Sequence, residues 1–350
     1  MSKKINYFKN KFKCNFSFLN NKKILVTGGT GSFGSAFIKN VLQKSKPSRL
    51  VVFSRDEYKQ FKLKKELESF SNYKILRFFL GDVRDLERLK TAIRDIDFIV
   101  HAAAIKQIDT AEYNPFECIK TNIIGAENIV RAALSAPNLL NVISLSTDKA
   151  VNPINLYGAS KLAADKIFIA ANQSARKNDT KFSIVRYGNV IASRGSIIPY
   201  FLDMGKNKKQ IINLTDSKMT RFWISIEEAV NFVVSSLENM VGGEIFIPKI
   251  PSMNVNDILK SIAPNNPIKI IGKRPGEKVH ETLLSEDESE NSYESNDRFV
   301  TFPSFIDFKK IYRKKYMNFK KVVKEFSYTS LNNSDWIKKN QIKAIIKKII

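Results

Sequence analysis

Two short runs in the middle of the chain carry residue types that can move protons, Ser146-Thr147-Asp148-Lys149 and Tyr157-Gly158-Ala159-Ser160-Lys161. A tyrosine and a lysine four positions apart share one face of a helix. The ammonium group and the positive end of that helix favour the phenolate, so Tyr157 can exchange a proton with a sugar hydroxyl while a nicotinamide exchanges hydride. Asp148 and Lys149 add an acid and a base that hydride transfer alone does not need, which predicts elimination of water from an oxidised sugar.

A lysine acts as a base only as the neutral amine. This interpretation therefore predicts that burial or neighbouring cations lower the pKa of Lys149. Taken alone, an Asp-Lys pair after a strand is more often a surface ion pair without a chemical role. The surrounding sequence has to decide between these two interpretations.

A glycine-rich run, Thr27-Gly28-Gly29-Thr30-Gly31-Ser32-Phe33-Gly34, follows an apolar stretch and precedes an amphipathic one. In that position one glycine permits a tight turn, another lets the backbone approach a pyrophosphate, and the last lets the helix pack on the strand. We predict a dinucleotide site there, the alternative being a glycine-rich turn without a ligand. The expected contacts are Gly28, Thr30, Gly31, Ser32, Phe33 and Gly34.

The end of the second apolar run bears on the choice of cofactor. NAD enzymes usually have an acid here for the ribose hydroxyls, whereas this chain has Ser54 and Arg55. A hydroxyl and a guanidinium would bind a 2′-phosphate that a carboxylate would repel, so NADP is predicted over NAD. The next two residues, Asp56-Glu57, are expected to open the following helix, where acids are favourable. Further along the chain, Asp82 and Val83 are placed to meet the adenine, and Ala102, Ala103 and Ala104 to lie along the cofactor.

Short apolar runs alternate with longer amphipathic ones from Lys23 to Arg186, which is typical of βαβ units and a parallel sheet. We predict an α/β fold with a Rossmann-type doubly wound parallel sheet and a smaller C-terminal α/β substrate lobe. The expected strands are 24–27, 50–54, 75–80, 98–101, 142–146 and 182–186, and the expected helices are 33–43, 57–70, 85–94, 115–134, 157–172, 197–204, 226–239 and 255–263.

This pattern predicts four segments along the chain. They are a basic N-terminal extension (1–21), an NADP-binding Rossmann domain (22–190), a substrate-binding lobe interleaved with part of the sheet (191–308) and a basic C-terminal segment (309–350). Residues 286–296 are polar and acidic, which predicts an exposed loop. Residues 342–350 are amphipathic as a helix, which would pack on the body or lie on a membrane.

The composition is that of a globular protein, with 43% hydrophobic residues in 350. Cys14 and Cys118 are the only cysteines, too few for a disulfide framework and without metal-ligand spacing, so we expect the reduced cytoplasm and no metal. No apolar run reaches the roughly 20 residues that span a bilayer, and the N-terminus lacks the apolar core of a signal peptide.

The net charge of +24 is concentrated at the ends of the chain. Residues 1–23 hold seven lysines and no acid, and residues 309–350 hold thirteen basic residues against two acids. The central body is only mildly basic, so nucleic acid is not expected as a partner. A basic tail leaves an anionic membrane surface open as a partner, the alternative being a solvated lysine-rich bias.

From about residue 22 to about residue 336 the chain resembles the extended short-chain dehydrogenase/reductase superfamily and, within it, the inverting UDP-N-acetylglucosamine 4,6-dehydratases. Lys149 sets it apart from glucose-type 4,6-dehydratases, which resemble Thr-Asp-Glu at this position. Tyr157 sets it apart from the longer membrane-bound retaining relatives, which carry Met. The motifs that carry the resemblance are TGGTGSFG, FSRDE, GDVRD, HAAAIKQ, AEYNPFECIKTN, LSTDKAVNPINLYGASK, VRYGNV, SRGSIIP, MTRFWIS, GGEIFIPKIPSM and RPGEKVHE.

The resemblance implies how the proton-transfer roles divide. Tyr157 would take the proton of the hydroxyl on carbon 4 as hydride passes to NADP, while Lys161 holds the nicotinamide ribose and keeps the phenol acidic. Lys149 would then remove the acidified proton on carbon 5, and Asp148 would protonate the hydroxyl leaving carbon 6. Thr147 would bind the developing oxyanion. Hydride would return to carbon 6, and reprotonation of carbon 5 from the opposite face would give the inverted sugar.

The resemblance also implies which residues line the pocket. Arg221 and Arg274 would bind the diphosphate, since a guanidinium suits phosphate oxygens, the alternative being surface salt bridges. The run 107–110 departs from the family pattern and leaves local substrate contacts open, while His101 is expected to be structural and His280 has no assigned role. Lys106 and Thr121 would contact the cofactor, and the expected substrate contacts are Lys106, Asn189, Val190, Arg221, Arg274 and Glu277.

The leading hypothesis is NADP-dependent elimination of water from UDP-N-acetylglucosamine with inversion at carbon 5. The product would be UDP-2-acetamido-2,6-dideoxy-L-arabino-hex-4-ulose, made for flagellin or surface glycans in a pathway of the pseudaminic acid type. The resemblance further implies a homo-oligomer, a dimer or a hexamer. One alternative is a UDP-sugar 4-epimerase, which needs Tyr157 and Lys161 but neither Asp148 nor Lys149. Another is a non-catalytic dinucleotide-binding scaffold with basic tails.

Overall fold

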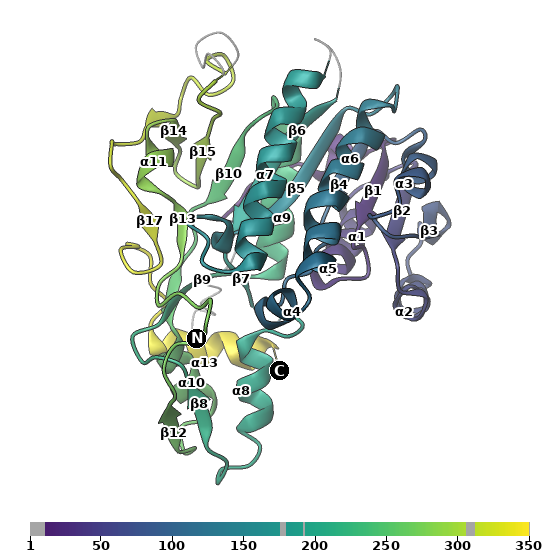
Figure 1. Ribbon diagram of the computed structural model, residues 1–350. Helices are drawn as coiled ribbons and strands as arrows, with labels where there is room; N and C mark the ends of the chain where they lie inside the picture. Colours follow the sequence, from purple (N-terminus) through teal and green to yellow (C-terminus); the bar gives the residue numbers. More distant parts are fainter. Residues whose placement is uncertain (1–10, 176–179, 192, 306–311, 350) are drawn as a thin grey trace, which may run out of the picture.

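The central feature of the fold is a large sheet whose middle strands are parallel (Figure 1). The computed structural model describes residues 11–175, 180–191, 193–305 and 312–349. Across these residues the strand order is β16-β14-β15-β10-β6-β5-β4-β1-β2-β3. The parallel strands are β1 Lys23–Thr27, β2 Arg49–Ser54, β3 Leu76–Leu80, β4 Phe98–His101, β5 Asn141–Thr147, β6 Lys181–Tyr187 and β10 Ile245–Pro248. The antiparallel strands at one edge are β14 Ser292–Glu294, β15 Arg298–Thr301 and β16 Lys320–Lys321.

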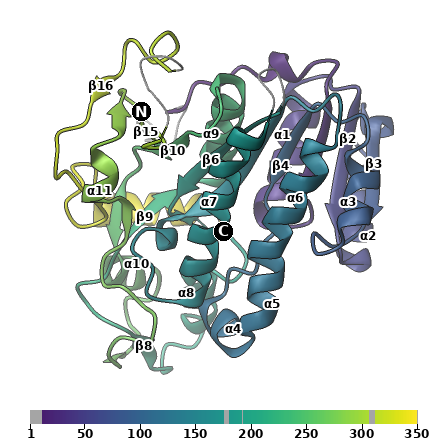
Figure 2. The same cartoon turned by 45° about the horizontal axis from the view of Figure 1, so that its top comes forward.

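Helices cover both faces of the sheet (Figures 1 and 2). On one face α6 packs against α3 and α7, and on the other α1 packs against α9. This two-sided cover buries the parallel strands on both faces. The helices of this body are α1 Ser32–Lys44, α2 Glu57–Leu67, α3 Leu86–Ile93, α4 Ile108–Tyr113, α5 Pro115–Ile119, α6 Gly125–Leu134, α7 Leu156–Ser174, α9 Ile226–Asn239 and α11 Glu286–Ser289, with short turns η1 Phe16–Leu19, η2 Tyr73–Ile75, η3 Lys120–Ile124 and η4 Asp148–Ala150.

Side-chain caps fix where the helices after strands begin. Asp56 accepts a hydrogen bond from Lys59 N–H at the start of α2, and Asp85 does the same for Arg88 N–H at the start of α3. Asn155 accepts from Gly158 N–H and so begins α7, the helix that carries Tyr157 and Lys161. Each such cap satisfies a backbone donor that the first helical turn leaves unpaired.

A second, smaller body lies beyond the carboxyl ends of the parallel strands (Figure 1). Its own hydrophobic cluster includes Phe201, Trp223 and Ile258 and is separate from the core around the large sheet. Its elements are α8 Ile197–Met204, α10 Val255–Ile262, α13 Lys339–Ile349, β7 Asn189–Val190, β8 Ile212–Leu214, β9 Thr220–Ile224, β11 Ser252–Asn254 and β12 Ile268–Ile270. A further antiparallel pair of strands, β13 Thr282–Leu284 and β17 Tyr328–Thr329, adjoins it.

The predicted α/β fold class is confirmed, and each predicted strand lies within one residue of an observed one. The chain after residue 191 does not form one separate lobe, because β10, β14 and β15 extend the large sheet. The prediction of an exposed loop at 286–296 was wrong. Ser285 and Glu288 form a capping box that begins α11, and Glu288 binds the buried Arg186 guanidinium at 2.8 Å. One acid of this segment, Glu288, therefore takes part in capping a helix and neutralises a buried cation.

The amphipathic C-terminal helix packs on the second body. In α13, Ile342 and Ile346 are buried in the cluster that includes α10. These two apolar side chains are therefore covered by the chain itself. No helix among the described residues combines the length and apolar character needed to cross a membrane.

Replacement of Ile342 by Ala tests the packing of this helix. The change removes a side chain that is 2% exposed, so it should lower the free energy of unfolding by about 2–5 kcal/mol. Urea denaturation measures the difference, with Lys343→Ala on the exposed side of α13 as the control. Equal stabilities of the two variants would contradict the packing described here.

Candidate active site

A single cavity of about 740 Å³ opens at the carboxyl ends of the parallel strands and contains most of the predicted site residues. Ligands of doubly wound sheets bind at this edge. The lining includes every predicted catalytic and cofactor residue, namely Gly28, Thr30, Gly31, Ser32, Phe33, Gly34, Ser54, Arg55, Asp82, Val83, Ala102, Ala103, Lys106, Thr121, Thr147, Asp148, Lys149, Tyr157 and Lys161. It also includes the predicted substrate contacts Asn189 and Val190. Their roles remain predictions, but the fold does bring them together.

The glycine-rich turn between β1 and α1 forms a cradle that only glycine permits. Gly28 has φ of 64°, and a Cβ there would lie 2.9 Å from the backbone of Ala102. A Cβ at Gly34 would lie 2.5 Å from the Gly28 carbonyl oxygen. Gly31 is the N-cap residue of helix α1, and it has no side chain that could accept a hydrogen bond from the first N–H groups of the helix. Such a close backbone approach with free N–H groups fits the pyrophosphate of a dinucleotide.

His101 at the end of β4 is hydrogen-bonded to Thr27, the residue before the glycine-rich turn. The hydroxyl of Thr27 accepts hydrogen bonds from the N–H groups of Ala102 and Ala103, at 3.2 and 3.3 Å, and lies 2.8 Å from His101 Nδ1. Burial lowers the pKa of His101 to about 3, so the ring is neutral and can accept a hydrogen bond from the Thr27 hydroxyl. The predicted structural role of this histidine agrees with these contacts.

Two cations and a fixed hydroxyl lie at the end of β2. Gln60 Nε2 donates to Ser54 Oγ at 3.0 Å and to Ser54 O at 2.9 Å, which holds this corner in place. Asp56 lines the cavity too, but it caps α2, as predicted, and pairs with Lys59 Nζ at 2.7 Å. Arg55 is more than half exposed and lies 3.8 Å from Asp82. This end of the cavity is therefore lined by two cations, Arg55 and Lys59, each beside an acid.

Tyr157 and Lys161 lie on the first two turns of α7 and line the cavity, Lys161 buried and Tyr157 half-buried. Burial raises the pKa of Tyr157 to about 12, although a hydrogen bond with Thr147 and the charge of Lys149 act to lower it. Burial also lowers the pKa of Lys161, while Asp165 opposes this change. The expected phenolate was therefore wrong for the structure as it stands, because loss of solvent outweighs the neighbouring positive charges.

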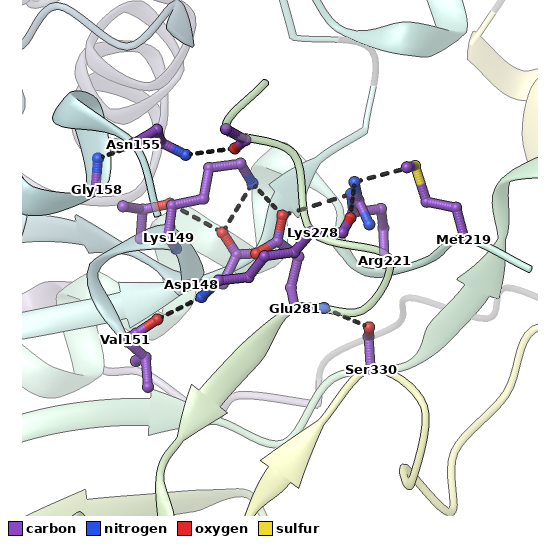
Figure 3. Close-up of polar contacts among 12 residues, drawn as sticks. Asp148, Lys149, Val151, Asn155, Gly158, Met219, Arg221, Lys278, Glu281 and Ser330 are labelled. Carbon is purple, nitrogen blue, oxygen red and sulfur yellow. Dashed lines mark hydrogen bonds and ion pairs between the residues drawn. The ribbon is translucent and has the colours of Figure 1, made fainter. Parts of the chain in front are cut away.

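Lys149 lies between two buried carboxylates (Figure 3). Its Nζ is 3.1 Å from Asp148 Oδ1 and 3.0 Å from Glu281 Oε1, and the exposed fraction is 19% for the Lys149 side chain and 1–2% for the two acids. Burial alone would lower the pKa of Lys149, but the two carboxylates outweigh it and raise the pKa. The predicted lowering was wrong, since the sequence argument allowed only for burial and cations.

The two oxygens of Asp148 have different surroundings. Oδ1 accepts from Thr147 Oγ1 at 3.0 Å and from Lys149. Across the described residues, Oδ2 has no hydrogen-bond partner. Burial raises the pKa of Asp148, an effect that Glu281 adds to and Lys149 opposes. A carboxyl group with one oxygen unengaged and a raised pKa is suited to donate a proton.

Three predicted substrate residues lie outside the cavity lining, namely Arg221, Arg274 and Glu277. The Arg221 guanidinium donates to the carbonyls of Lys278 at 2.9 Å and Val279 at 3.0 Å. It thus supports the loop that leads to Glu281. Arg274 is exposed at the start of that loop, and its N–H donates to Glu277 Oε2 at 3.4 Å.

Sequence reasoning missed Arg194, Asn122 and Glu281. Arg194 N–H donates to Ser32 Oγ at 3.1 Å, and its guanidinium reaches Thr30 O, so it crosses the glycine-rich turn. Asn122 binds both the N–H and the carbonyl of Ile105 and fixes the loop that carries Lys106. The motif SRGSIIP contains Arg194, but nothing local points it toward the cofactor turn. The described part of the chain contains no group of three or more His, Cys, Asp or Glu side chains able to hold a metal ion.

Comparisons with known proteins agree with this geometry. Residues 24–303 match the model of the family described as polysaccharide biosynthesis protein. The chain is 49% identical, over 93% of its length and 98% of the relative, to a UDP-N-acetylglucosamine 4,6-dehydratase (inverting) of Campylobacter jejuni. It is 42% identical, over 76% of its length and 79% of the relative, to a UDP-glucose 4-epimerase of Rickettsia bellii. The X-ray structure of Pen from Bacillus thuringiensis superimposes with a TM-score of 0.86 at 36% identity, covering 95% of this chain and 99% of that one.

Gly34→Ala tests the dinucleotide cradle. The added Cβ would overlap the Gly28 carbonyl and push α1 from the turn, so the affinity for a nicotinamide dinucleotide should fall by about 1–3 kcal/mol, roughly 5- to 150-fold. Isothermal titration calorimetry measures the affinity, with Lys39→Ala on the outer side of α1 as the control. An unchanged affinity in Gly34→Ala would mean that the dinucleotide does not bind at this turn.

Proposed function

We propose a reaction for this chain from the family to which it belongs. The chain is a member of the polysaccharide biosynthesis protein family and, within it, of the inverting UDP-N-acetylglucosamine 4,6-dehydratases. These enzymes are hydro-lyases of the short-chain dehydrogenase/reductase type. The chain removes water from UDP-N-acetylglucosamine with inversion at carbon 5 and yields UDP-2-acetamido-2,6-dideoxy-L-arabino-hex-4-ulose. The observation that carries this proposal is the placement of Asp148 and Lys149 in one cavity with Tyr157 and the glycine-rich turn. The reaction supplies nucleotide sugars for flagellin or surface glycans of the pseudaminic acid type.

The first step is oxidation at carbon 4. A nicotinamide dinucleotide at the glycine-rich turn supplies a reversible hydride acceptor for this chemistry. Tyr157 takes the proton of the carbon 4 hydroxyl as the phenolate, so this step requires a lower pKa than the one burial gives Tyr157 here. The hydrogen bond with Thr147 and the charge of Lys149 act in that direction. Lys161, on the same face of α7, is placed to bind the nicotinamide ribose and to supply positive charge beside Tyr157.

The second step is elimination by the pair Asp148–Lys149. A shift of one proton from Lys149 Nζ to Asp148 Oδ1, across 3.1 Å, turns the ion pair into a neutral amine and a carboxylic acid without changing the net charge. The amine then removes the proton on carbon 5, and the acid protonates the hydroxyl on carbon 6, which leaves as water. Elimination thus returns the pair to ammonium and carboxylate. Return of the hydride to carbon 6 and protonation of carbon 5 from the opposite face would then give the 4-keto-6-deoxy product with no net change in the dinucleotide. The raised pKa of Lys149 is compatible with this cycle, because the proton is moved inside the pair rather than lost to water.

The preference for NADP belongs to the same proposal. Arg55 and Lys59 line the end of the cavity beyond β2, and Asp56 is engaged in capping α2. A 2′-phosphate would meet positive charge there and no unpaired acid. These contacts support NADP over NAD.

A UDP-sugar 4-epimerase is the second candidate, and the 42% identity to a protein of that name favours it. Epimerisation needs reversible oxidation at carbon 4, which Tyr157 and Lys161 can serve. It gives no use to a buried acid and lysine at the same ring. The Asp148–Lys149 pair therefore favours the dehydratase.

Incubation with UDP-N-acetylglucosamine tests the reaction. The wild type should release a 4-keto-6-deoxy sugar nucleotide, identified by mass spectrometry, without net formation of NADPH. Lys149→Ala removes the base and should slow product formation by roughly 10²- to 10⁴-fold, while Lys120→Ala on the surface changes nothing. If Lys149→Ala formed product at the wild-type rate, the assignment of the base would be wrong.

Arg55→Ala tests the choice of cofactor. Loss of one charge-assisted hydrogen bond should weaken NADP binding by about 1.5–3 kcal/mol, roughly tenfold to a hundredfold, and leave NAD binding nearly unchanged. Calorimetric titration with both dinucleotides gives the ratio of affinities, and Lys64→Ala on the outer face of α2 is the control. A similar loss for NAD and NADP would count against a 2′-phosphate at this position.

A further inference from the structure

Glu281 lies behind Lys149 and outside the cavity. Its side chain is 2% exposed, and its Oε1 is 3.0 Å from Lys149 Nζ and 3.6 Å from Arg221 Nε. Glu281 does not line the cavity, whereas Lys149 and Asp148 do. Any effect of Glu281 on substrate therefore has to act through its charge on the cavity residues Lys149 and Asp148.

The backbone holds this carboxylate in place. Glu281 N–H donates to Ser330 Oγ at 2.9 Å, and Ser330 N–H donates to Glu281 O at 2.8 Å. In the loop before Glu281, the Arg221 guanidinium donates to the carbonyls of Lys278 and Val279, and Figure 3 shows Arg221 beside Glu281. Glu281 is thus a fixed, buried anion, unlike the long mobile side chains of surface ion pairs.

The loop before Glu281 is hydrogen-bonded to residues that follow Lys149 in the sequence. Lys278 Nζ donates to Val151 O at 2.6 Å, and Asn155 Nδ2 donates to Gly276 O at 2.8 Å (Figure 3). Asn155 is also the residue that caps α7. The loop, the cap of the Tyr157 helix and the acid–base pair therefore form one hydrogen-bonded unit.

We propose that Glu281 is a positioning residue whose fixed negative charge holds Lys149 in place. In this arrangement Lys149 and Asp148 share a single proton. This inference rests on the proposed function. With Glu281 as the fixed anion, Asp148 need not remain ionised to balance the lysine, and it can carry the proton for the leaving hydroxyl. Two carboxylates beside one lysine thus take different roles.

The proposal has a definite consequence for pH dependence. Product formation needs one proton in the Asp148–Lys149 pair, so activity falls when the pair gains a second proton at low pH or loses the first at high pH. The charges facing Lys149 are Asp148, Glu281, Arg221 and Lys278, with the Tyr157 hydroxyl nearby. The negative charge of Glu281 raises the pKa of both members of the pair. Removing that charge lowers both pKa values.

The test is the pH profile of kcat for product formation from UDP-N-acetylglucosamine at saturating substrate. Glu281→Gln keeps the shape of the side chain and removes its charge, so both limbs of the profile should move to lower pH by roughly one unit or more. Glu281→Asp draws the carboxylate back from Lys149 and should give a smaller shift in the same direction. KM should change little, because Glu281 does not line the cavity. Glu290→Gln, on the exposed end of α11, should keep the wild-type profile.

If the pH profiles of the wild type and both Glu281 variants had their limbs at the same pH, the inference would be overturned, even with a lower kcat in the variants. A merely structural residue lowers kcat without moving the limbs. If Glu281→Gln does not fold, the shift in Glu281→Asp decides. Absence of the 4-keto-6-deoxy product with the wild type would overturn the proposed function together with this inference. Product with unmoved limbs would overturn this inference alone.

Discussion

The ion pairs of Lys149 with Asp148 and Glu281 are the interaction on which the site depends. A buried ammonium is costly unless carboxylates face it, and removing one partner of such a pair leaves an uncompensated charge. Here the two partners come from distant parts of the chain, since Asp148 directly follows β5 and Glu281 lies 133 positions later, just before β13. Closing this cluster therefore requires the second body to sit against the carboxyl edge of the sheet, where the cavity lies.

A second buried cation repeats this arrangement deeper in the fold. Arg186 on β6 is 1% exposed, and it lies 2.8 Å from Glu288 and 3.7 Å from Asp165. Asp165 in turn accepts from the Ser146 hydroxyl at 2.7 Å, one residue before Thr147. This network attaches α11 to the sheet and to the helix that carries Tyr157. Two buried cations thus hold the late part of the chain on the dinucleotide-binding part.

Much of the fold follows from local sequence. Apolar, β-branched runs such as 24–27 and 98–101 are long enough only for buried strands, and the cap at Asn155 sets the start of the helix with Tyr157 and Lys161. The glycine-rich turn was found for the same reason, since its spacing has a local steric cause. These features need no knowledge of distant contacts.

What the sequence could not supply was the environment of each charge. The pKa of Lys149 was predicted in the wrong direction because the prediction left out the carboxylate of the adjacent Asp148, which raises this pKa. The pairing with Glu281, which raises it further, is remote in sequence and appears only in three dimensions. Arg221 was expected at a diphosphate, yet it binds loop carbonyls, because a guanidinium suits either partner and only the fold selects one. The acidic run at 286–296 was read as solvated, although one of its acids neutralises Arg186.

The central claim is that Asp148 and Lys149 remove water from a sugar oxidised at carbon 4. The most direct measurement is NMR analysis of the product formed from UDP-N-acetylglucosamine in D₂O. Our account predicts a 4-keto-6-deoxy sugar with deuterium from solvent at carbon 5 and the inverted configuration there. A product that keeps the carbon 6 hydroxyl, differs only in configuration at carbon 4 and has no deuterium at carbon 5 would contradict it.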